Sequence, residues 1–425
     1  MRTSLVSLTL FSLFSVLSPR VVLAAPTTIS LQPLVPYIDS NTNNVLWTPT
    51  DGGHPQPRRG NLGASILGPT NSPLGLQNAD TLAPPTTDNG EVKNFKWPFS
   101  LSHNKLKEGG WARQQNVNDM PIATDIAGVN MRLEAGAIRE MHWHDTAEGD
   151  LRVSTVTPEG QVWLGDVSAG DLWYFPAGYP HSIQAKDTTP EGAEFLLIFD
   201  KGDFSEDATF QLTDWLAHVP KSVIAKNFGM DGNLAAFDHI PQHELYIFPS
   251  IPPPDDIKKD MVVPNDTPQP FTFEFSKVPV VQKPGGTVKT VDTRTFAISE
   301  KIAAAEVYLE AGRLRELHWH PTQPEWTFFL EGQARITLFA SQSNAQTSDF
   351  YPGDIAYIPP SYGHYIENVG NTTLKFLEVL KTDLFQDISL SQWLALTPPE
   401  LVKAHLGFSD ETITRLSKTK GTLVK

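Results

Sequence analysis

Six of the chain's twelve histidines occur in two sets whose spacing is typical of metal ligands. Each set has a His-x-His pair, a glutamate four or five residues later and one more histidine farther along. Alternate residues of a β-strand point to the same face, so each pair would direct both imidazoles inward. Three neutral nitrogens and a carboxylate suit a divalent transition metal and leave coordination positions open. The candidate ligands are His142, His144, Glu148 and His181 in the first set, and His318, His320, Glu325 and His364 in the second.

The identity of the metal is constrained by the absence of cysteine. It excludes a disulfide framework, Cys-ligated zinc or iron–sulfur sites and a thiol nucleophile. A lone His-x-His pair on a strand is usually a surface or core feature, but here the whole set occurs twice with matching flanks. Metal binding is therefore the favoured interpretation for both sets. Without thiolates zinc and Cu(I) are disfavoured, and the ligand types leave iron, manganese, nickel and copper open.

Both ligand sets lie within a longer internal repeat. Its matching segments lie 176 to 183 residues apart, and they are 133–144 with 309–320, 170–176 with 353–359, and 210–217 with 388–395. Only two copies exist, which indicates a duplicated domain rather than a solenoid. We expect an N-terminal arm over 26–94 that is extended, a first domain over 95–247, a proline-rich linker over 248–271 and a second domain over 272–425 with a helical tail.

The elements that must position the ligands are short strands. Segments such as 335–339 and 374–380 are strand-like, and Gly, Pro and Asn separate them. Many short strands with even turn spacing favour a sandwich or a barrel. The sequence therefore predicts an all-β chain with short helices flanking each copy.

The length, the net charge and the N-terminal residues limit the classes to which the protein can belong. A chain of 425 residues suggests two or three domains, and a net charge of −15 without a basic run predicts no nucleic-acid partner. Residues 1–25 have an early arginine, an apolar stretch and small residues at the end, which is typical of a secretory signal peptide. We therefore expect secretion, no membrane span, and glycosylation sequons at Asn265 and Asn371.

The residues around both ligand sets resemble the two motifs of cupins. The first motif is matched by Gly136-x5-His142-x-His144-x3-Glu148 and Gly312-x5-His318-x-His320-x4-Glu325, and the second by Gly170-x5-Pro176-x-Gly178-x2-His181 and Gly353-x5-Pro359-x-Ser361-x2-His364-x3-Asn368. Two positions depart from the pattern, because Ser361 stands in place of a glycine and Ala185 in place of an asparagine.

Residues 95–415 resemble the bicupin oxalate decarboxylases in particular. The resemblance runs through Arg-Glu-Leu-His-Trp-His, Gly-Asp-Leu-Trp-Tyr-Phe-Pro and Phe-Gln-Leu-Thr-Asp-Trp-Leu-Ala-His. It implies two cupin β-barrels of the jelly-roll type in tandem, each holding one manganese ion. It also implies that oxalate is converted to formate and CO2 by a carboxy-lyase with dioxygen as cofactor.

Arg139 and Arg315 each lie three residues before the first histidine of a set. That odd spacing would place them on the opposite face of a regular strand, so a bulge or twist must turn them inward. A planar guanidinium holds a carboxylate at two points. We expect both arginines to bind oxalate, a small dianion that an acidic protein must attract locally.

The reaction also needs a proton donor, because the fragment left after CO2 departs must be protonated to give formate. Residues 205–209 resemble the family's lid over the first site, which makes Glu206 the first candidate. The same segment also reads as an ordinary helix start with Ser205 as its cap. Glu378 occupies the place of a second family glutamate and is the second candidate. Phe385 follows seven residues later, at a position where the family often has tyrosine. No side-chain hydroxyl is therefore available there for a hydrogen bond.

The copies differ by a six-residue gap. Residues 326–331 of the second copy have no counterpart after Glu148, so the interval from glutamate to histidine is 39 residues in one copy and 33 in the other. Six strand residues span roughly 20 Å, so the first barrel is predicted to lack most of a strand. We expect weakened metal binding at Glu148 unless neighbouring segments rebuild that strand or the recorded sequence has lost a short coding segment.

Three alternatives remain open at this point. An oxalate oxidase on the same scaffold would differ by the protonation step. A non-catalytic, storage-like bicupin is disfavoured because all eight ligands are present. A bicupin dioxygenase acting on another substrate would share the fold, so only the arginines and the lid distinguish it. The sequence leaves open whether the chain forms a homo-oligomer.

Overall fold

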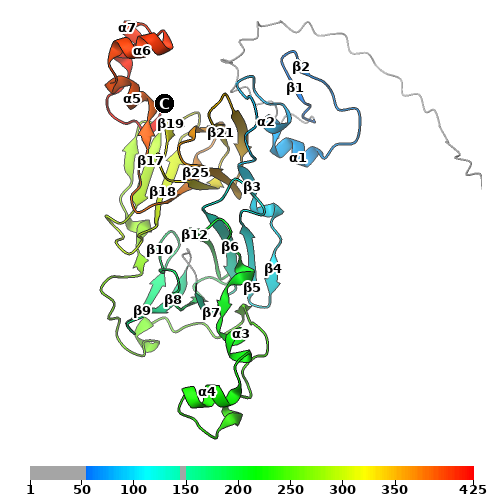
Figure 1. Ribbon diagram of the computed structural model, residues 1–425, viewed down its shortest axis with the longest axis vertical. Helices are drawn as coiled ribbons and strands as arrows, with labels where there is room; N and C mark the ends of the chain where they lie inside the picture. The colour runs from blue at the N-terminus through cyan, green and yellow to red at the C-terminus, as the bar shows by residue number, and fades with distance from the viewer. Residues whose placement is uncertain (1–53, 144–149) are drawn as a thin grey trace, which may run out of the picture. The chain divides into compact units, whose positions relative to one another are not determined.

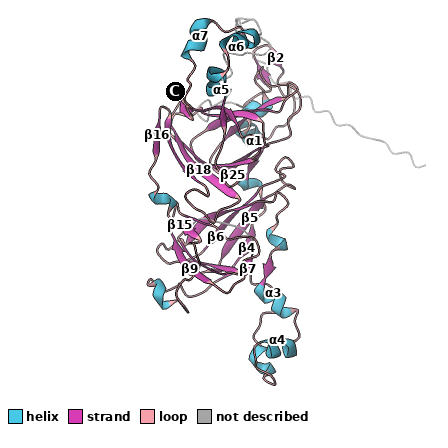
Figure 2. Ribbon diagram, turned by 60° about the vertical axis from the view of Figure 1, so that its left-hand side comes forward, coloured by secondary structure: helices cyan, strands magenta, loops and turns pink. Residues whose placement is uncertain are grey.

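The computed structural model describes residues 54–143 and 150–425. Strands dominate both copies of the repeat, and the helices are short segments beside them (Figure 2). The predicted all-β class with short flanking helices is therefore confirmed. Among the described residues, no helix is both long enough and apolar enough to cross a bilayer.

The first copy consists of antiparallel sheets (Figure 1). One sheet has the order β13-β7-β11-β8-β9, with β14 beside β7, and another has the order β12-β6-β5-β4. The strands are β4 (Lys105–Lys107), β5 (Gly110–Gln115), β6 (Ala127–Leu133), β7 (Ile138–Trp143), β8 (Leu151–Val156), β9 (Val162–Val167), β10 (Leu172–Trp173), β11 (His181–Ala185), β12 (Ala193–Phe199), β13 (Phe210–Gln211) and β14 (Ile247–Phe248).

The second copy repeats this arrangement with a larger sheet. Its sheets have the orders β22-β21-β24-β19-β26, with β27 beside β19, and β16-β17-β18-β25-β20-β23-β3. The strands are β16 (Val281–Lys283), β17 (Gly286–Val291), β18 (Ile302–Leu309), β19 (Leu314–Trp319), β20 (Glu325–Glu331), β21 (Ala334–Phe339), β22 (Ala345–Phe350), β23 (Asp354–Ile358), β24 (Gly363–Asn368), β25 (Leu374–Lys381), β26 (Ile388–Ser389) and β27 (Leu423–Val424).

The copies exchange one strand each. β3 (Lys96–Pro98) lies at the start of the first copy in the chain but pairs with β23 of the second. β15 (Thr272–Phe273) lies at the start of the second copy but pairs with β10 of the first. Each copy therefore supplies an edge strand to the sheet of the other.

The sheet of the first copy is interrupted where the sequence gap falls. In the second copy, β20 lies between β25 and β23 and pairs with both. In the first copy, no strand of the described residues joins β12 to β10, the counterparts of β25 and β23. The prediction that the first barrel lacks this strand is confirmed for the described part of the chain.

Each barrel is filled by residues that alternate along its strands. On β6, Val129, Met131 and Leu133 are fully buried in the first core, and on β18, Ala305, Val307 and Leu309 are fully buried in the second. Each large apolar side chain in such a core contributes roughly 1.5–3 kcal/mol relative to an exposed one. The two cores hold the strands that carry the candidate ligands.

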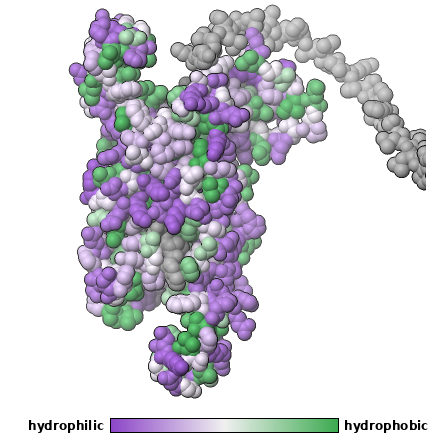
Figure 3. Space-filling model, viewed as in Figure 1, coloured by the Kyte–Doolittle hydropathy of each residue, from purple (hydrophilic) through white to green (hydrophobic). Residues whose placement is uncertain are grey.

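Short helices flank both copies. α3 (Leu212–Ala217) and α4 (Lys221–Asn227) follow β13, and α5 (Leu390–Leu396), α6 (Pro399–Leu406) and α7 (Asp410–Arg415) follow β26. Hydrophobic side chains reach the surface of the segment that carries α4 (Figure 3), and among them are Val223, Phe228 and Met230.

The N-terminal segment is partly helical rather than extended as expected. It contains β1 (Arg58–Arg59), β2 (Leu62–Gly63), α1 (Ser72–Gln77) and α2 (Ala79–Leu82). Asp80 of α2 is buried and forms ion pairs of 2.5 Å with Arg59 and 2.6 Å with Arg335 of β21. This segment therefore contacts the second copy through Asp80 and Arg335.

Candidate metal centres

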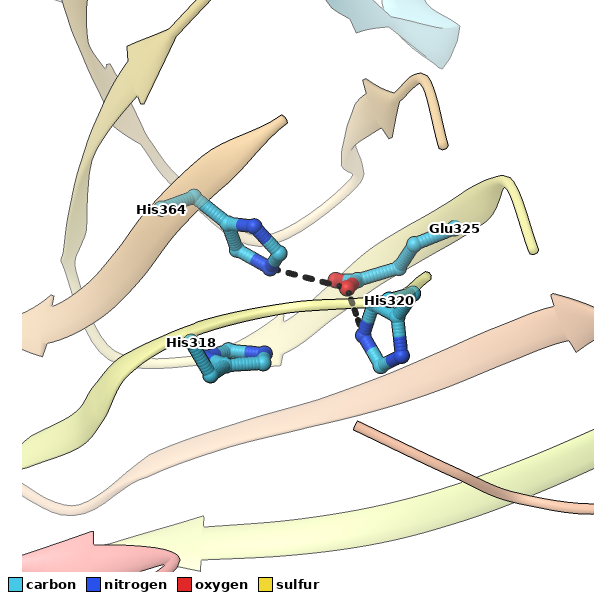
Figure 4. A group of neighbouring side chains, drawn as sticks. All are labelled: His318, His320, Glu325 and His364. Carbon is cyan, nitrogen blue, oxygen red and sulfur yellow. Dashed lines mark hydrogen bonds and ion pairs between the residues drawn. The ribbon is translucent and has the colours of Figure 1, made fainter. Parts of the chain in front are cut away.

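The four predicted ligands of the second copy converge in the interior of its barrel (Figure 4). Their ligand atoms all lie within 4.8 Å of one another, and all four side chains are buried. One oxygen of Glu325 lies 2.9 Å from Nε2 of His320 and 3.0 Å from Nε2 of His364. His318 faces the same point from β19.

The strand geometry brings the ligands and the arginine to one face. β19 pairs with β24 so that Arg315 is opposite Ile366 and His318 is opposite His364. The register shifts between those pairs, because three residues of β19 are matched by two of β24. The bulge predicted from the odd spacing is therefore confirmed, and it turns Arg315 into the barrel.

Backbone carbonyls fix the tautomer of each histidine in the second set. Nδ1 of His318 lies 2.6 Å from the carbonyl of Glu316, Nδ1 of His320 lies 2.7 Å from that of Gln386, and Nδ1 of His364 lies 3.0 Å from that of Tyr362. A carbonyl only accepts, so Nδ1 carries the proton and donates it. Each neutral ring then presents the lone pair of Nε2 to the centre, as a metal requires.

The charges of His318 and Glu325 match this assignment. Burial lowers the pKa of His318 well below its usual value, and the nearby Arg315 and other histidines lower it further. Burial also disfavours the charged form of Glu325, but its close contacts with His364 and His320 hold its pKa well below the usual range. A neutral imidazole and an ionised carboxylate are the ligand forms of these residues.

The residues present fit a divalent metal. Nε2 of His318 is buried and has no hydrogen-bond partner among residues 54–143 and 150–425, although it faces three other ligand atoms. A buried polar atom without a partner is costly, and a metal ion would satisfy it. The set has nitrogen and carboxylate donors without a thiolate, which suits manganese among the metals that the sequence left open.

A buried ion-pair network lies beside this set. Nε of Arg315 donates to Glu378 at 3.0 Å and its Nη2 donates to Asp387 at 3.0 Å. The Arg315 and Glu378 side chains are each 1% exposed. Nη1 of Arg315 and Oε2 of Glu378 have no hydrogen-bond partner within the described structure. One donor and one acceptor therefore remain for a ligand.

The network sets the protonation of its members in opposite directions. Burial raises the pKa of Glu378, and the charge of Glu325 adds to that effect against the attraction of Arg315. Asp387 has its pKa lowered to about 2, because Arg315 and Lys420 outweigh the effect of burial. Glu378 is therefore the member of the network that retains a proton more readily.

The first copy shows half of its ligand set within the described residues. His142 and His181 are buried, and their ring centroids are 4.4 Å apart, close to the 4.1 Å between the equivalent His318 and His364. Nδ1 of His181 lies 2.8 Å from the carbonyl of Tyr179, and Nδ1 of His142 contacts that of Glu140. These two imidazoles therefore have the same tautomer as their counterparts. His144 and Glu148 lie outside the described residues.

Arg139 and Glu206 form the equivalent ion pair in the first copy. Nη2 of Arg139 lies 2.9 Å from Oε2 of Glu206, and both side chains are buried. β7 and β11 show the same register shift, between the pairs Arg139–Ile183 and His142–His181. The second predicted bulge is therefore also confirmed. Glu206 begins a short 3-10 turn capped by the Ser205 hydroxyl, so the capping interpretation of this segment holds as well.

Two residues of the networks were missed at the level of the sequence. Tyr246 donates its hydroxyl proton to Glu206 at 2.9 Å and stacks on the Arg139 guanidinium at 4.1 Å. Asp387 is the second partner of Arg315. Glu140, which follows Arg139 in the chain, accepts from the backbone N–H of Tyr246 at 2.9 Å, but no spacing in the sequence indicates that contact.

One motif departure has a local consequence. Ser361 has φ 67°, the left-handed conformation that the glycine of the motif adopts without strain, and Gly178 of the first copy has φ 84°. The Ser361 hydroxyl donates to the carbonyl of Pro321 at 2.7 Å. The substitution is therefore accommodated beside the second ligand set at the cost of some backbone strain.

Comparisons with known proteins agree with this architecture. The cupin family model matches residues 100–236 and 274–414. Oxalate decarboxylase OxdC of Bacillus subtilis (strain 168) is 48% identical over 379 residues, which cover 87% of this chain and 97% of that protein. A probable oxalate decarboxylase of Arthroderma benhamiae is 42% identical over 375 residues, which cover 85% of this chain and 91% of that protein.

Solved structures give the same result. A structure of Bacillus subtilis oxalate decarboxylase at pH 4.6 has a TM-score of 0.82 at 46% identity, covering 87% of this chain and 97% of that one. Another, from a study of the Mn(II) centres of that enzyme, has a TM-score of 0.83 at 47% identity, covering 88% and 100%. The chain therefore belongs to the bicupin oxalate decarboxylase family.

Proposed function

We propose that this protein is a secreted, manganese-dependent carboxy-lyase that converts oxalate to formate and CO2. The buried set of three histidines and Glu325, with the Arg315–Glu378 pair beside it, carries the proposal. Similarity over nearly the whole length of oxalate decarboxylases supports the substrate, and the Mn(II) centres of a solved relative support the metal. We further propose two manganese ions per chain when both sets are intact, with dioxygen as a cofactor.

The balance of the reaction requires one proton and no net oxidation. Oxalate and one proton give formate and CO2, as the bond between the two carbons breaks and a C–H bond forms. Oxidation of oxalate by dioxygen instead gives two molecules of CO2 and hydrogen peroxide, with two protons taken up. A positioned acid therefore separates the decarboxylase from the oxidase.

The chain's own residues would bind and orient the substrate. A bound manganese ion would supply Lewis-acid and redox chemistry at the histidine–glutamate set. Arg315 has a free donor in Nη1, and Arg139 has one in Nε within the described structure. A guanidinium stabilises a carboxylate at short range in a buried site. Each arginine would thus neutralise the oxalate carboxylate that faces it.

Glu206 and Glu378 would supply the proton, with Glu206 as the first candidate. Glu206 lies outside the barrel strands, on a turn between β12 and β13, and one of its oxygens has no partner among the described residues. Glu378 lies within β25, and burial favours its protonated form. Each glutamate is held by the arginine of its own copy.

Product analysis tests the proposal. The purified protein would be given oxalate and Mn(II) in air at mildly acidic pH, and formate, CO2 and peroxide would be measured. Formate with little peroxide is the expected result, whereas CO2 and peroxide without formate would establish the oxidase. If metal-loaded protein produced neither formate nor peroxide from oxalate, the remaining interpretations would be a non-catalytic bicupin or an enzyme that acts on another substrate.

Matched variants assign the donor. Glu206→Gln and Glu378→Gln keep the size of each side chain and remove its acid. The variant of the true donor is expected to lose formate production by about 10²-fold or more and to retain its metal content. Equal, unchanged formate rates in both variants would remove both glutamates as donors.

The proposal of secretion is tested separately. Residues 1–25 lie outside the described residues, so it depends on their sequence. Expression of the full chain in a eukaryotic secretory host should release protein whose N-terminal residue is Ala25 or Pro26. Retention of Met1 in a cell-bound product would contradict it.

A further inference from the structure

A cavity of about 80 Å³ lies beside the interrupted sheet of the first copy. Strands β10 and β12 of the first copy and β17, β18 and β25 of the second all contribute to its lining. None of the described lining residues is charged, and five are aromatic: Trp173, Tyr174, Phe275, Phe296 and Trp326. The cavity is distinct from both candidate metal centres, because it contains none of their ligands.

The internal repeat shows what occupies the equivalent place in the other half of the molecule. Trp326 is the first residue of the six that the first copy lacks, and its side chain is fully buried against the first copy. Its indole N–H donates to the Gln115 side chain at 2.8 Å. Its ring lies against Gly128, where an added Cβ would approach the indole to 2.4 Å.

The partners of Trp326 have counterparts that line the cavity. Gln115 and Gly128 face each other across β5 and β6. By the register of the repeat they correspond to Val291 and Ala304, which face each other across β17 and β18. Both Val291 and Ala304 line the cavity. The cavity therefore lies where the missing counterpart of Trp326 would place an aromatic ring.

We propose that this cavity binds small, uncharged aromatic molecules with a single ring. The cavity, at about 80 Å³, is smaller than the apolar cavity of roughly 150 Å³ that binds benzene, so its ligand is limited to a single small ring. The five aromatic side chains offer stacked and edge contacts to such a ring. Val291 stands where Gln115 accepts the indole N–H in the other half, so a ring without a polar N–H is preferred.

Fluorine NMR of the full-length protein tests the proposal with fluorobenzene as the probe. Binding should shift and broaden the probe signal, and toluene should displace it. Fluorocyclohexane, a saturated probe of similar size, should bind more weakly. Absence of fluorobenzene binding to the natural chain, or equal binding of both probes, would overturn the proposal.

Two variants test whether fluorobenzene binds in this cavity. Ala304→Leu fills the space and should weaken fluorobenzene binding by about tenfold or more. Ala404→Leu makes the same exchange at an exposed position of α6 and should leave the affinity unchanged. Equal weakening or no change in the two variants would place the probe elsewhere.

A second variant keeps the test decisive if Ala304→Leu does not fold. Insertion of the sequence of residues 326–331 between Glu148 and Gly149 supplies the missing aromatic residue and should abolish fluorobenzene binding. Full binding by a folded insertion variant would contradict the proposal. Oxalate turnover and metal content are measured separately, so failure here leaves the proposed function untouched.

Discussion

Tyr246 contributes to the first site through another residue. Its hydroxyl donates to the same Glu206 oxygen that accepts from Arg139, so two donors hold that oxygen. Tyr246 is therefore a positioning residue, and its ring also covers the Arg139 guanidinium.

Tyr246→Phe is expected to lower kcat for formate production by roughly tenfold, since one hydrogen bond to a charged group is lost. KM for oxalate should stay within about twofold, because Arg139 is retained. Steady-state kinetics across pH measures both, with Tyr308→Phe, a tyrosine remote from Glu206, as the matched control. An unchanged kcat would show that the hydroxyl does not position the acid.

At the residue scale, the sequence alone points to those site residues that occur at matching positions in both copies. The ligand histidines, their partner glutamates and both arginines follow from matching spacings in two copies, whereas Glu206 and Glu378 were candidates only through the family resemblance. Asp387 and Tyr246 escaped because each copy recruits a different partner for its arginine from a distant segment. No local spacing encodes such a contact.

At the scale of elements, the predicted class of fold and the predicted bulges were correct because periodicity and ligand spacing determine them. The exchange of β3 and β15 between the copies was not predictable. β15 and β3 are strands of two and three residues, and their partners lie about 100 and about 260 residues away in the chain. A strand this short has no periodicity of its own, and the sheet of the other copy determines it.

The interrupted sheet yields a prediction about metal content. After exhaustive dialysis, we expect the natural chain to retain about one manganese ion, because the first set lacks the strand that would hold its carboxylate in place. Insertion of residues 326–331 after Glu148 should raise retention to about two. Elemental analysis of dialysed protein measures this, and six Gly/Ser residues inserted at the same place provide the control.

Two tightly bound ions in the natural chain would contradict this prediction. So would equal retention by the two insertion variants, since that would show that added length alone restores the site. The metal content of the second set should not change in either variant.

At the scale of the whole molecule, the attachment of the N-terminal segment depends on pH. Burial raises the pKa of Asp80 to about 7, and the charge of Asp349 adds to this against Arg335 and Arg59. A carboxyl group with a raised pKa binds its proton more tightly in the folded state. Its contribution to stability is fully present below about pH 4 and is lost as pH rises toward about 7.

Asp80→Asn should remove this dependence. For the natural chain, we expect the free energy of unfolding to fall between pH 4 and 7 by at most about 1.4 kcal/mol per pH unit from this group. The variant should show a smaller fall in thermal or urea denaturation. Asp187→Asn, at an exposed position, serves as the control, and identical pH profiles for all three proteins would refute the role of Asp80.

The exchanged strands have a consequence for how such a gene persists. Within the described residues, the first half lacks part of its own barrel, but its β3, which lies at its N-terminal end, still completes the sheet of the second half. Selection that preserves the second centre must then also preserve the first half as scaffold. Neither half is free to be discarded, because a cut at the boundary of the duplication would remove a strand from each product.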